Sequence, residues 1–250
     1  MPLPPLGINL WQFHRQLENH LVAEVLAAVA KCGFKTIEMV GPVPDPVALR
    51  ARLDALGLTC AARHMVLAEL DDPGAVARSC AALGTATICS SGLRVWDQRG
   101  PAQYREAALA LNTAGTALRR HGIALAYHHH DFELEPVLGA RTGMDLLMEH
   151  GDPGAWSFCI DIGWVQQAGL DPLSYLRTHR LRTTYVHLRD QTKDRHSTPL
   201  GRGIIDLRAI VHEIESNTRI RYAMVEQEPG TDPVMDAALS RKFLYDGFGW

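Results

Sequence analysis

Residues 123–133 read IALAYHHHDFE, an apolar run that ends in three histidines, an aspartate and a glutamate. Its first half is typical of a buried strand, because apolar residues follow one another without polar interruption. Similar runs recur along the chain, separated by longer stretches with helical spacing, which is typical of a parallel sheet. We predict eight strands, at residues 7–11, 36–40, 59–65, 85–90, 123–130, 157–162, 184–190 and 222–228.

Helices fill the intervals, and four are predicted at residues 46–56, 73–83, 102–120 and 233–246. Gly33, Gly57, Gly84 and Gly122 each follow a helical stretch and precede a strand, as helix C-caps do. Eight strand–helix repeats in 250 residues predict an α/β protein with a single (β/α)₈ TIM barrel domain spanning residues 1–250. A doubly wound sheet is the alternative, but residues 7–14, GINLWQFH, contain no glycine-rich phosphate loop.

Composition favours a small polar substrate over a polymer or a membrane. The formal net charge is −3, and no run of Lys and Arg indicates a nucleic-acid or membrane surface. The five cysteines are widely spaced without a CxxC pair, so we expect reduced core residues. Residues 1–7 lack a basic segment followed by an apolar one, so we expect a cytoplasmic protein.

Polar side chains gather where the predicted strands end, which in a barrel is the functional face. They are Glu38, His64, His128, His129, His130, Asp131, Glu133, Asp161, His187, Arg189, Asp190, Glu226 and Glu228. Ionised groups inside a barrel need partners or a metal ion, because desolvation is costly. Four of them come from consecutive strands and suit one divalent cation, Mn²⁺ first, with Mg²⁺, Co²⁺ and Zn²⁺ as alternatives. These four predicted ligands are Glu133, Asp161, His187 and Glu226.

Several of these residues also have purely structural interpretations. His128 and His130 share one face of their strand, whereas His129 points away. Asp161 suits a helix N-cap. Glu38 could pair with a neighbouring Arg, and Asp190 suits a turn. Trp11 and Trp164 are either a wall for stacking a sugar or rim packing, with packing slightly favoured for Trp11.

Five segments resemble the sugar phosphate isomerase/epimerase family of xylose isomerase-like TIM barrels. They are YHHHDFE (127–133), IDIGWVQQAG (160–169), VHLRD (186–190), LGRGIID (200–206) and MVEQE (224–228), with GFKTIE (33–38) matching the second strand. The resemblance implies a Glu, Asp, His, Glu metal set, which falls on the same four residues. His128 or His130 is the alternative ligand, with Glu133 then acting as a base. The resemblance alone is compatible with a homodimer.

His129, Arg189 and Arg202 depart from the family pattern, which has YHNH, HLKD and GEG at these places. Arginine stays protonated, so Arg189 is not expected to donate a proton.

The leading expectation is an isomerase or epimerase of a sugar, sugar phosphate or keto-sugar. The metal would stabilise an enediolate, Glu133 and Glu226 would be bases on opposite faces, and His130 would be an alternative base. We expect the substrate to contact His64, which would bind a hydroxyl, and also His128, Arg189, Glu38 and Trp164.

The same enolate can expel a leaving group, so a lyase acting on an inosose or a 3-keto-glycoside is the alternative function. A barrel nuclease of abasic-site repair is disfavoured, because Trp164 replaces its histidine and the net charge is negative. A sugar-binding barrel without activity is a third alternative. The aromatic segment FLYDGFGW (243–250) is expected to dock on the barrel or on a second subunit.

Overall fold

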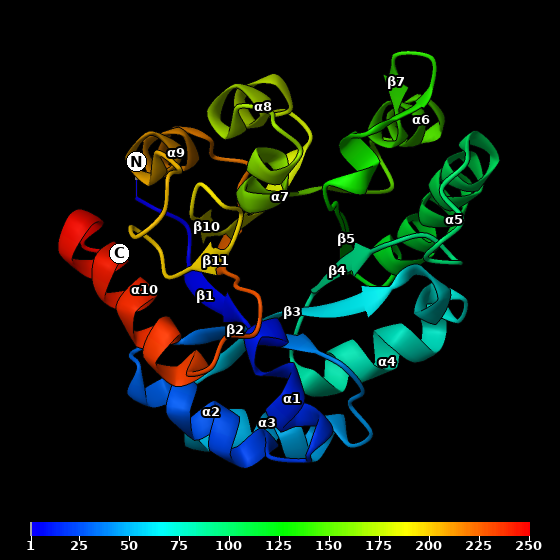
Figure 1. Ribbon diagram of the computed structural model, residues 1–250. Helices are drawn as coiled ribbons and strands as arrows, with labels where there is room; N and C mark the ends of the chain where they lie inside the picture. The colour runs from blue at the N-terminus through cyan, green and yellow to red at the C-terminus, as the bar shows by residue number, and fades with distance from the viewer. Residues whose placement is uncertain (1) are drawn as a thin grey trace.

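A computed structural model describes residues 2–250, and its central feature is a closed barrel of eight parallel strands (Figure 1). Each strand pairs with two neighbours in the cyclic order β1-β12-β9-β8-β5-β4-β3-β2. The barrel strands are β1 (Leu6–Asn9), β2 (Thr36–Val40), β3 (Thr59–Val66), β4 (Thr87–Ser91), β5 (Ala124–His128), β8 (Ser157–Asp161), β9 (Thr183–Leu188) and β12 (Tyr222–Val225). The predicted TIM barrel is therefore confirmed.

Helices surround the strands, and two short antiparallel pairs lie outside the barrel (Figure 1). The helices are α1 (His14–Glu18), α2 (Val22–Lys31), α3 (Pro46–Ala55), α4 (Pro73–Leu83), α5 (Pro101–Arg119), α6 (Gly143–His150), α7 (Ile162–Gln167), α8 (Pro172–Thr178), α9 (Leu207–Ser216) and α10 (Pro233–Phe248). The 3₁₀ turns are η1 (Leu10–Phe13), η2 (Leu67–Leu70) and η3 (Phe132–Leu134). The outer pairs are β6 (Pro136–Leu138) with β7 (Arg141–Thr142), and β10 (Asp190–Gln191) with β11 (Ser197–Thr198).

One local sequence signal begins four of these helices. An aspartate followed by proline starts α3, α4, α8 and α10, and in each the aspartate side chain accepts a hydrogen bond from a backbone N–H of the first turn. The carboxylate satisfies a donor that the helix leaves open, and proline fits the first turn without losing a hydrogen bond. The sequence next to each of these four helices therefore determines where the helix begins.

The apolar core lies between the helices and the strands, and a smaller cluster fills the barrel interior. That inner cluster contains Ala61, Ala62, Cys89, Ala126, Cys159, Tyr185 and Met224. All five cysteines are free thiols, and four of them are buried. Within residues 2–250, no helix combines the length and hydrophobicity that a membrane-spanning segment requires.

The C-terminal segment docks on the barrel of its own chain. The indole Nε1 of Trp250 donates a hydrogen bond to the backbone oxygen of Pro4 at 2.7 Å, and Arg241 donates to the backbone oxygen of Trp250 at 2.7 Å. Phe243 and Phe248 pack against the apolar core. From the sequence, we expect this segment to dock on the barrel or on a second subunit. In the structure it docks on the barrel.

Candidate metal centre and cavity

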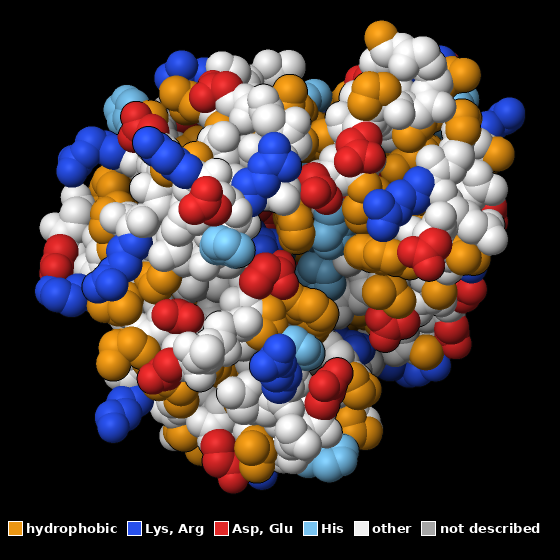
Figure 2. Space-filling view, in the orientation of Figure 1, with side chains coloured by type: hydrophobic (Ala, Val, Ile, Leu, Met, Phe, Trp, Pro, Cys, Tyr) orange, Lys and Arg blue, Asp and Glu red, His pale blue; other side chains and the backbone are white. Residues whose placement is uncertain are grey.

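A cavity of about 540 Å³ opens at the carboxyl ends of the barrel strands. Figure 2 shows histidine side chains at the bottom of a hollow in this face. The lining residues are Asn9, Trp11, Val40, Gly41, His64, Val66, Glu69, Ser91, Trp96, Arg99, His128, His130, Asp131, Phe132, Trp164, Glu226 and Glu228. Its size and mixed lining fit a small polar molecule.

Four side chains that converge at the floor of this cavity form what we call the floor cluster. Its members are His128, Asp161, His187 and Glu226, and one ligand atom from each lies within 4.8 Å of the others. Strand register brings them together, because Asp161 on β8 pairs with His187 on β9, and His128 ends β5. Nδ1 of His187 lies 2.6 Å from Oε2 of Glu226 and 4.0 Å from Oδ2 of Asp161.

The donor atoms of the floor cluster fit a divalent cation. Asp161 Oδ2, His187 Nδ1 and Glu226 Oε2 are buried, and among the described residues none of them has a hydrogen bond of good geometry, although buried polar atoms normally have one. His187 Nδ1 and Glu226 Oε2 face each other at 2.6 Å, so a cation there would separate two ligand atoms that now contact each other directly. Burial, with repulsion from His187, holds the pKa of His128 well below its ordinary value, so that its imidazole is neutral and can act as a ligand. Two imidazoles and two carboxylates are a common donor set for a divalent metal.

Glu38 supports this cluster from below instead of lining the cavity. Its Oε2 lies 2.8 Å from Nε2 of His187, and its Oε1 lies 2.7 Å from Nδ1 of His64. Asn9 donates a third hydrogen bond to Oε1 at 3.0 Å. A carboxylate that holds Nε2 of His187 leaves Nδ1 free to face Glu226, which is how metal-binding imidazoles are commonly oriented. Glu38 therefore lies beneath the cavity, and its contact with substrate stays a prediction.

Glu133 lies outside the floor cluster, contrary to its prediction as a ligand. It follows β5 in the turn η3 and is fully buried without lining the cavity. Its carboxylate accepts hydrogen bonds at 2.7 Å from the Tyr127 hydroxyl and from the backbone N–H of His130. Burial raises the pKa of Glu133 to about 7, against the effect of these hydrogen bonds. His128, the alternative ligand, has a ring nitrogen within 4.8 Å of the ligand atoms of Asp161, His187 and Glu226.

Asp161 both caps a helix and contributes to the cluster. Its Oδ1 accepts a hydrogen bond from the backbone N–H of Trp164 at 2.9 Å, which starts α7, while Oδ2 faces His187. Burial raises the pKa of Asp161 to about 7, partly offset by the guanidinium of Arg189. The motif also needs Gly163, because a Cβ atom there would lie 2.6 Å from the Cβ atom of Arg189.

Arg189 is buried and forms the far side of the cluster instead of lining the cavity. Its Nη1 lies 3.4 Å from Oε1 of Glu226 and 3.6 Å from Oδ2 of Asp161, and its Nη2 lies 2.5 Å from Oε1 of Glu228. The guanidinium stacks over the Trp164 ring, 4.5 Å from its centroid. Arg189 thus neutralises and positions carboxylates. It also lines a smaller pocket of about 130 Å³ with Trp164 and Glu228, and its contact with substrate stays a prediction.

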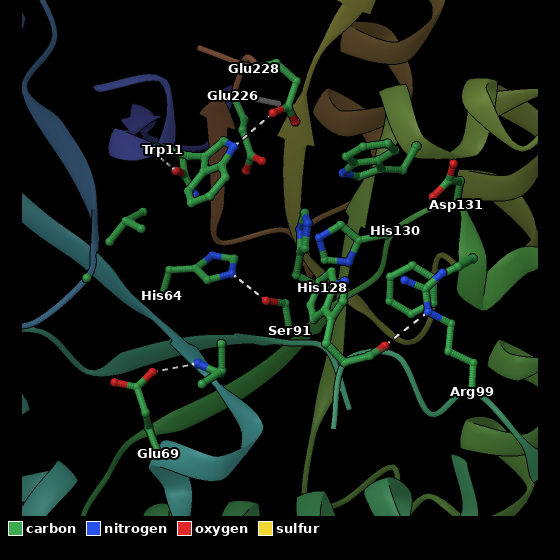
Figure 3. Close-up of a pocket in the computed structure, with 17 residues that line it drawn as sticks. Trp11, His64, Glu69, Ser91, Arg99, His128, His130, Asp131, Glu226 and Glu228 are labelled. Carbon is green, nitrogen blue, oxygen red and sulfur yellow. Dashed lines mark hydrogen bonds between the residues drawn. The ribbon is translucent and has the colours of Figure 1, made fainter. Parts of the chain in front are cut away.

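Two further histidines face the cavity with opposite charge preferences (Figure 3). Burial opposes the charged form of His64, but its contacts with Cys89 and Glu38 raise its pKa to about 10. Burial lowers the pKa of His130 to about 3, because its ring lies among Phe132, Trp96 and Trp164. The cavity therefore holds a readily protonated imidazole and a neutral one.

Aromatic side chains form the walls. Trp164 lines the cavity as expected, and Trp11 does so too, although rim packing was slightly favoured for it. The Trp11 indole donates to Oε2 of Glu228 at 3.1 Å. His129 is buried and does not line the cavity, as strand alternation predicts, and Arg202 is exposed on its loop.

The sequence interpretation missed several lining residues. Asn9 ends β1, and Ser91 ends β4 and donates to or accepts from Nε2 of His64 at 2.9 Å. Both residues are found by taking the polar side chains at the ends of β1 and β4, as for the other strands. Glu69 lies in the 3₁₀ turn η2, and Trp96 and Arg99 lie between β4 and α5, where no periodic signal indicates them.

Comparison with known proteins agrees with this geometry. Residues 26–246 match the sequence profile described as xylose isomerase-like TIM barrel. An inosose dehydratase of Clostridium perfringens is 26% identical over 163 residues, 57% of this chain and 54% of that protein. Another, of Halalkalibacterium halodurans, is 24% identical over 199 residues, 70% of this chain and 62% of that protein. The chain spans about half the length of the first curated relatives it matches.

Solved structures share the fold at low identity. A sugar phosphate isomerase/epimerase from Parabacteroides distasonis has a TM-score of 0.82 at 18% identity, covering 98% of this chain and 94% of that chain. The probable 3-DHS dehydratase AsbF from Bacillus anthracis has a TM-score of 0.74 at 15% identity, covering 96% and 98%. The IOLI protein with a binding zinc atom has a TM-score of 0.73 at 14% identity, covering 97% of each chain. With a sequence profile matched over most of its length and this barrel, the chain belongs to the xylose isomerase-like TIM barrel family.

Proposed function

We propose that the protein is a metal-dependent lyase that removes water from a polyhydroxylated cyclic ketone of the inosose type. One observation carries this proposal. Within the floor cluster a single carboxylate, Glu226, lines the cavity, and the imidazoles of His64, His128 and His130 line the same cavity. A carboxylate base with an imidazole acid suits elimination, which takes a proton from carbon and gives one to the leaving hydroxyl.

The floor cluster would hold one divalent cation, for which we propose Mn²⁺. The ligands would be His128, Asp161, His187 and Glu226, and the convergence of one ligand atom from each within 4.8 Å supports this assignment. A cation bound there would supply positive charge beside the substrate carbonyl and lower the pKa of the adjacent C–H.

Glu226 is the proposed base. Burial favours its neutral form, but His187 and Arg189 lower its pKa, so the carboxylate is ionised at neutral pH. It reaches the cavity from the end of β12 and would take the proton next to the carbonyl. The electron pair of that C–H bond then forms the carbon–carbon double bond as the β-hydroxyl leaves.

His64 is the proposed acid for the departing hydroxyl. It lines the cavity, and Glu38 holds its Nδ1 while Nε2 lies 2.9 Å from Ser91 Oγ. A divalent cation nearby would lower its raised pKa toward neutrality, the range in which an imidazole donates a proton efficiently. His130 stays neutral and would exchange hydrogen bonds with a substrate hydroxyl.

The relatives' names support this choice over an isomerase. The curated relatives that match are named inosose dehydratases. An epimerase that uses Glu133 and Glu226 on opposite faces has no support, because Glu133 is buried away from the cavity. The experiment below distinguishes isomerisation from loss of water.

The test is turnover of inososes, 3-keto-glycosides and ketoses by the Mn²⁺-loaded protein in D₂O, followed by NMR and mass spectrometry. We expect a product that has lost one water molecule. Glu226→Gln should abolish both water loss and solvent exchange of the α-proton. His64→Gln should slow water loss by roughly 10²–10⁴-fold, the usual contribution of a general acid, while α-proton exchange continues. His121→Gln, at an exposed position, is the matched control.

Two outcomes would contradict the proposal. Deuterium incorporation with rearrangement but no water loss would make the protein an isomerase or epimerase. If the metal-loaded protein catalysed neither proton exchange nor turnover of any of these compounds, it would instead be a sugar-binding barrel without activity.

A further inference from the structure

Two buried thiols lie next to the floor cluster and have no part in the proposed reaction. One ligand atom from each of Cys89, His128, Cys159 and His187 lies within 4.8 Å of the other three. The imidazoles are the same two that belong to the floor cluster, and all four residues are buried. His128 and His187 therefore lie close to the carboxylates of Asp161 and Glu226 and also to the thiols of Cys89 and Cys159.

Strand alternation explains why the two sets are adjacent. Cys159 precedes Asp161 by two residues on β8, so both side chains point into the barrel, one layer apart. Cys159 also pairs in register with His128, and its Sγ lies 3.9 Å from His128 Nδ1. Cys89 on β4 lies within hydrogen-bonding reach of Cys159 and His187.

The surroundings of the thiols are those of a tetrahedral site for a soft ion. The inner cluster around them contains Ala61, Ala62 and Ala126, which supply no ligand, together with Tyr185 and Met224. Glu38 is also near Cys89, but its carboxylate is already held by His64 and His187. Zinc bond lengths of about 2.3 Å to sulfur and 2.0 Å to nitrogen place ligand atoms about 3.3–3.8 Å apart. Donors that already lie within 4.8 Å of one another need only small side-chain shifts to reach this spacing.

We propose that Cys89, Cys159, His128 and His187 form a second metal site, which takes a thiophilic divalent cation such as Cd²⁺ or Zn²⁺. Thiolates select soft ions, whereas the carboxylates of Asp161 and Glu226 favour hard ones such as Mn²⁺. Binding converts the two thiols to thiolates and releases two protons to solvent for each ion bound. A neutral imidazole has a lone pair on only one ring nitrogen, so His128 and His187 cannot bind both ions at once. One ion therefore excludes the other, and soft ions expel Mn²⁺ from the floor cluster.

The test is titration of the reduced, metal-free protein with Cd²⁺, monitored by the ultraviolet charge-transfer absorption of Cd–thiolate bonds. We expect one Cd²⁺ per chain with this absorption, release of two protons, and none of the absorption with Mn²⁺. Cys89→Ala and Cys159→Ala should each lower Cd²⁺ affinity by at least about 10²-fold, more than loss of a supporting partner costs. Cys80→Ala removes another buried thiol, on α4, and should change nothing.

Mn²⁺ binding separates loss of the site from loss of the fold. Both cysteine variants should bind Mn²⁺ as the wild type does, since the carboxylate set is intact. Cd²⁺ bound without thiolate absorption, or simultaneous binding of Cd²⁺ and Mn²⁺, would overturn the proposal. These readouts do not use turnover, so they stand apart from the test of the lyase activity.

Discussion

The carboxylate of Glu38 accepts hydrogen bonds from two imidazoles, and its removal should weaken metal binding. Burial opposes its ionisation, but His187 and His64 hold its pKa well below the ordinary value, so the carboxylate is charged. Glu38→Gln should lower Mn²⁺ affinity about 10–100-fold, because an uncharged amide has one acceptor oxygen and cannot serve both His187 and His64. Calorimetric titration measures the effect. Glu69→Gln, at the cavity wall, is the control, and equal affinities for both variants would refute the orienting role.

Glu133 should make stability depend on pH near neutrality. Its folded-state pKa is raised from 4.5 to about 7, so the folded protein binds this proton more tightly than the unfolded chain does. The wild type should therefore lose stability as pH rises from about 4.5 to about 7, and Glu133→Gln should lose less.

Urea unfolding of the metal-free proteins at pH 5 and pH 8 measures this difference. Asp161 titrates in both proteins, so its contribution cancels. Exposed Glu135→Gln should follow the wild type. A difference between wild type and Glu133→Gln that does not change with pH would show that Glu133 is ionised throughout.

At the level of residues, three of the four predicted ligands lie in the floor cluster, and the fourth, Glu133, lies outside it. Asp161, His187 and Glu226 end regular strands, where alternation by two residues tells which side chains point inward. Glu133 lies beyond its strand in a 3₁₀ turn, where that rule no longer applies. The roles of Glu38 and Arg189 depend on partners from other strands, which no local pattern contains.

At the level of elements, the LGRGIID motif is a loop wrapped around one buried carboxylate. Asp190 accepts hydrogen bonds from the backbone N–H groups of Gly201, Gly203 and Ile205 at 2.9–3.2 Å. A Cβ atom on Gly203 would collide with the Asp190 carboxylate. Asp190→Asn should destabilise the protein by roughly 2–4 kcal/mol, because an amide group cannot accept all these hydrogen bonds.

Limited proteolysis within residues 192–206, together with thermal unfolding, tests this prediction. The variant should be cleaved faster in this loop and unfold at a lower temperature. Asp194→Asn, at an exposed position of the same loop, should behave as the wild type. Equal cleavage of both variants would mean that the loop is held by other contacts.

Strands and long helices were predictable because their signals are local. Residues 36–40 and 73–83 match β2 and α4 in both bounds, and glycine caps follow the helices with positive φ, as at Gly84 (φ +80°). The strand β11 was not among the predicted elements, and it pairs with β10. A two-residue strand has too few residues for a periodic signal, and its partner lies elsewhere in the chain.

At the level of the whole molecule, the metal should act as a cross-link between strands. The floor cluster joins β5, β8, β9 and the end of β12, so its ion contacts half of the barrel. A ligand at 100 times its Kd adds about 2.7 kcal/mol to stability. At about 2–4 °C per kcal/mol for a chain of this size, Mn²⁺ should raise Tm by about 5–10 °C.

Thermal unfolding with Mn²⁺ and with a chelator measures this shift. His128→Ala should abolish it, whereas exposed His212→Ala should keep it. A shift that persists in His128→Ala would place the stabilising ion elsewhere.

The pairing of β1 with β12 has a consequence for how the protein is made. Leu6 pairs with Ala223, so the seam that closes the barrel joins residues from opposite ends of the chain. A ribosome delivers the N-terminal strands first, and until β12 has emerged the growing sheet carries two unsatisfied edges. Open edges invite pairing with other chains. The nascent protein is therefore most exposed to aggregation just before its last strand is synthesised, a period in which chaperones would have the greatest effect on yield.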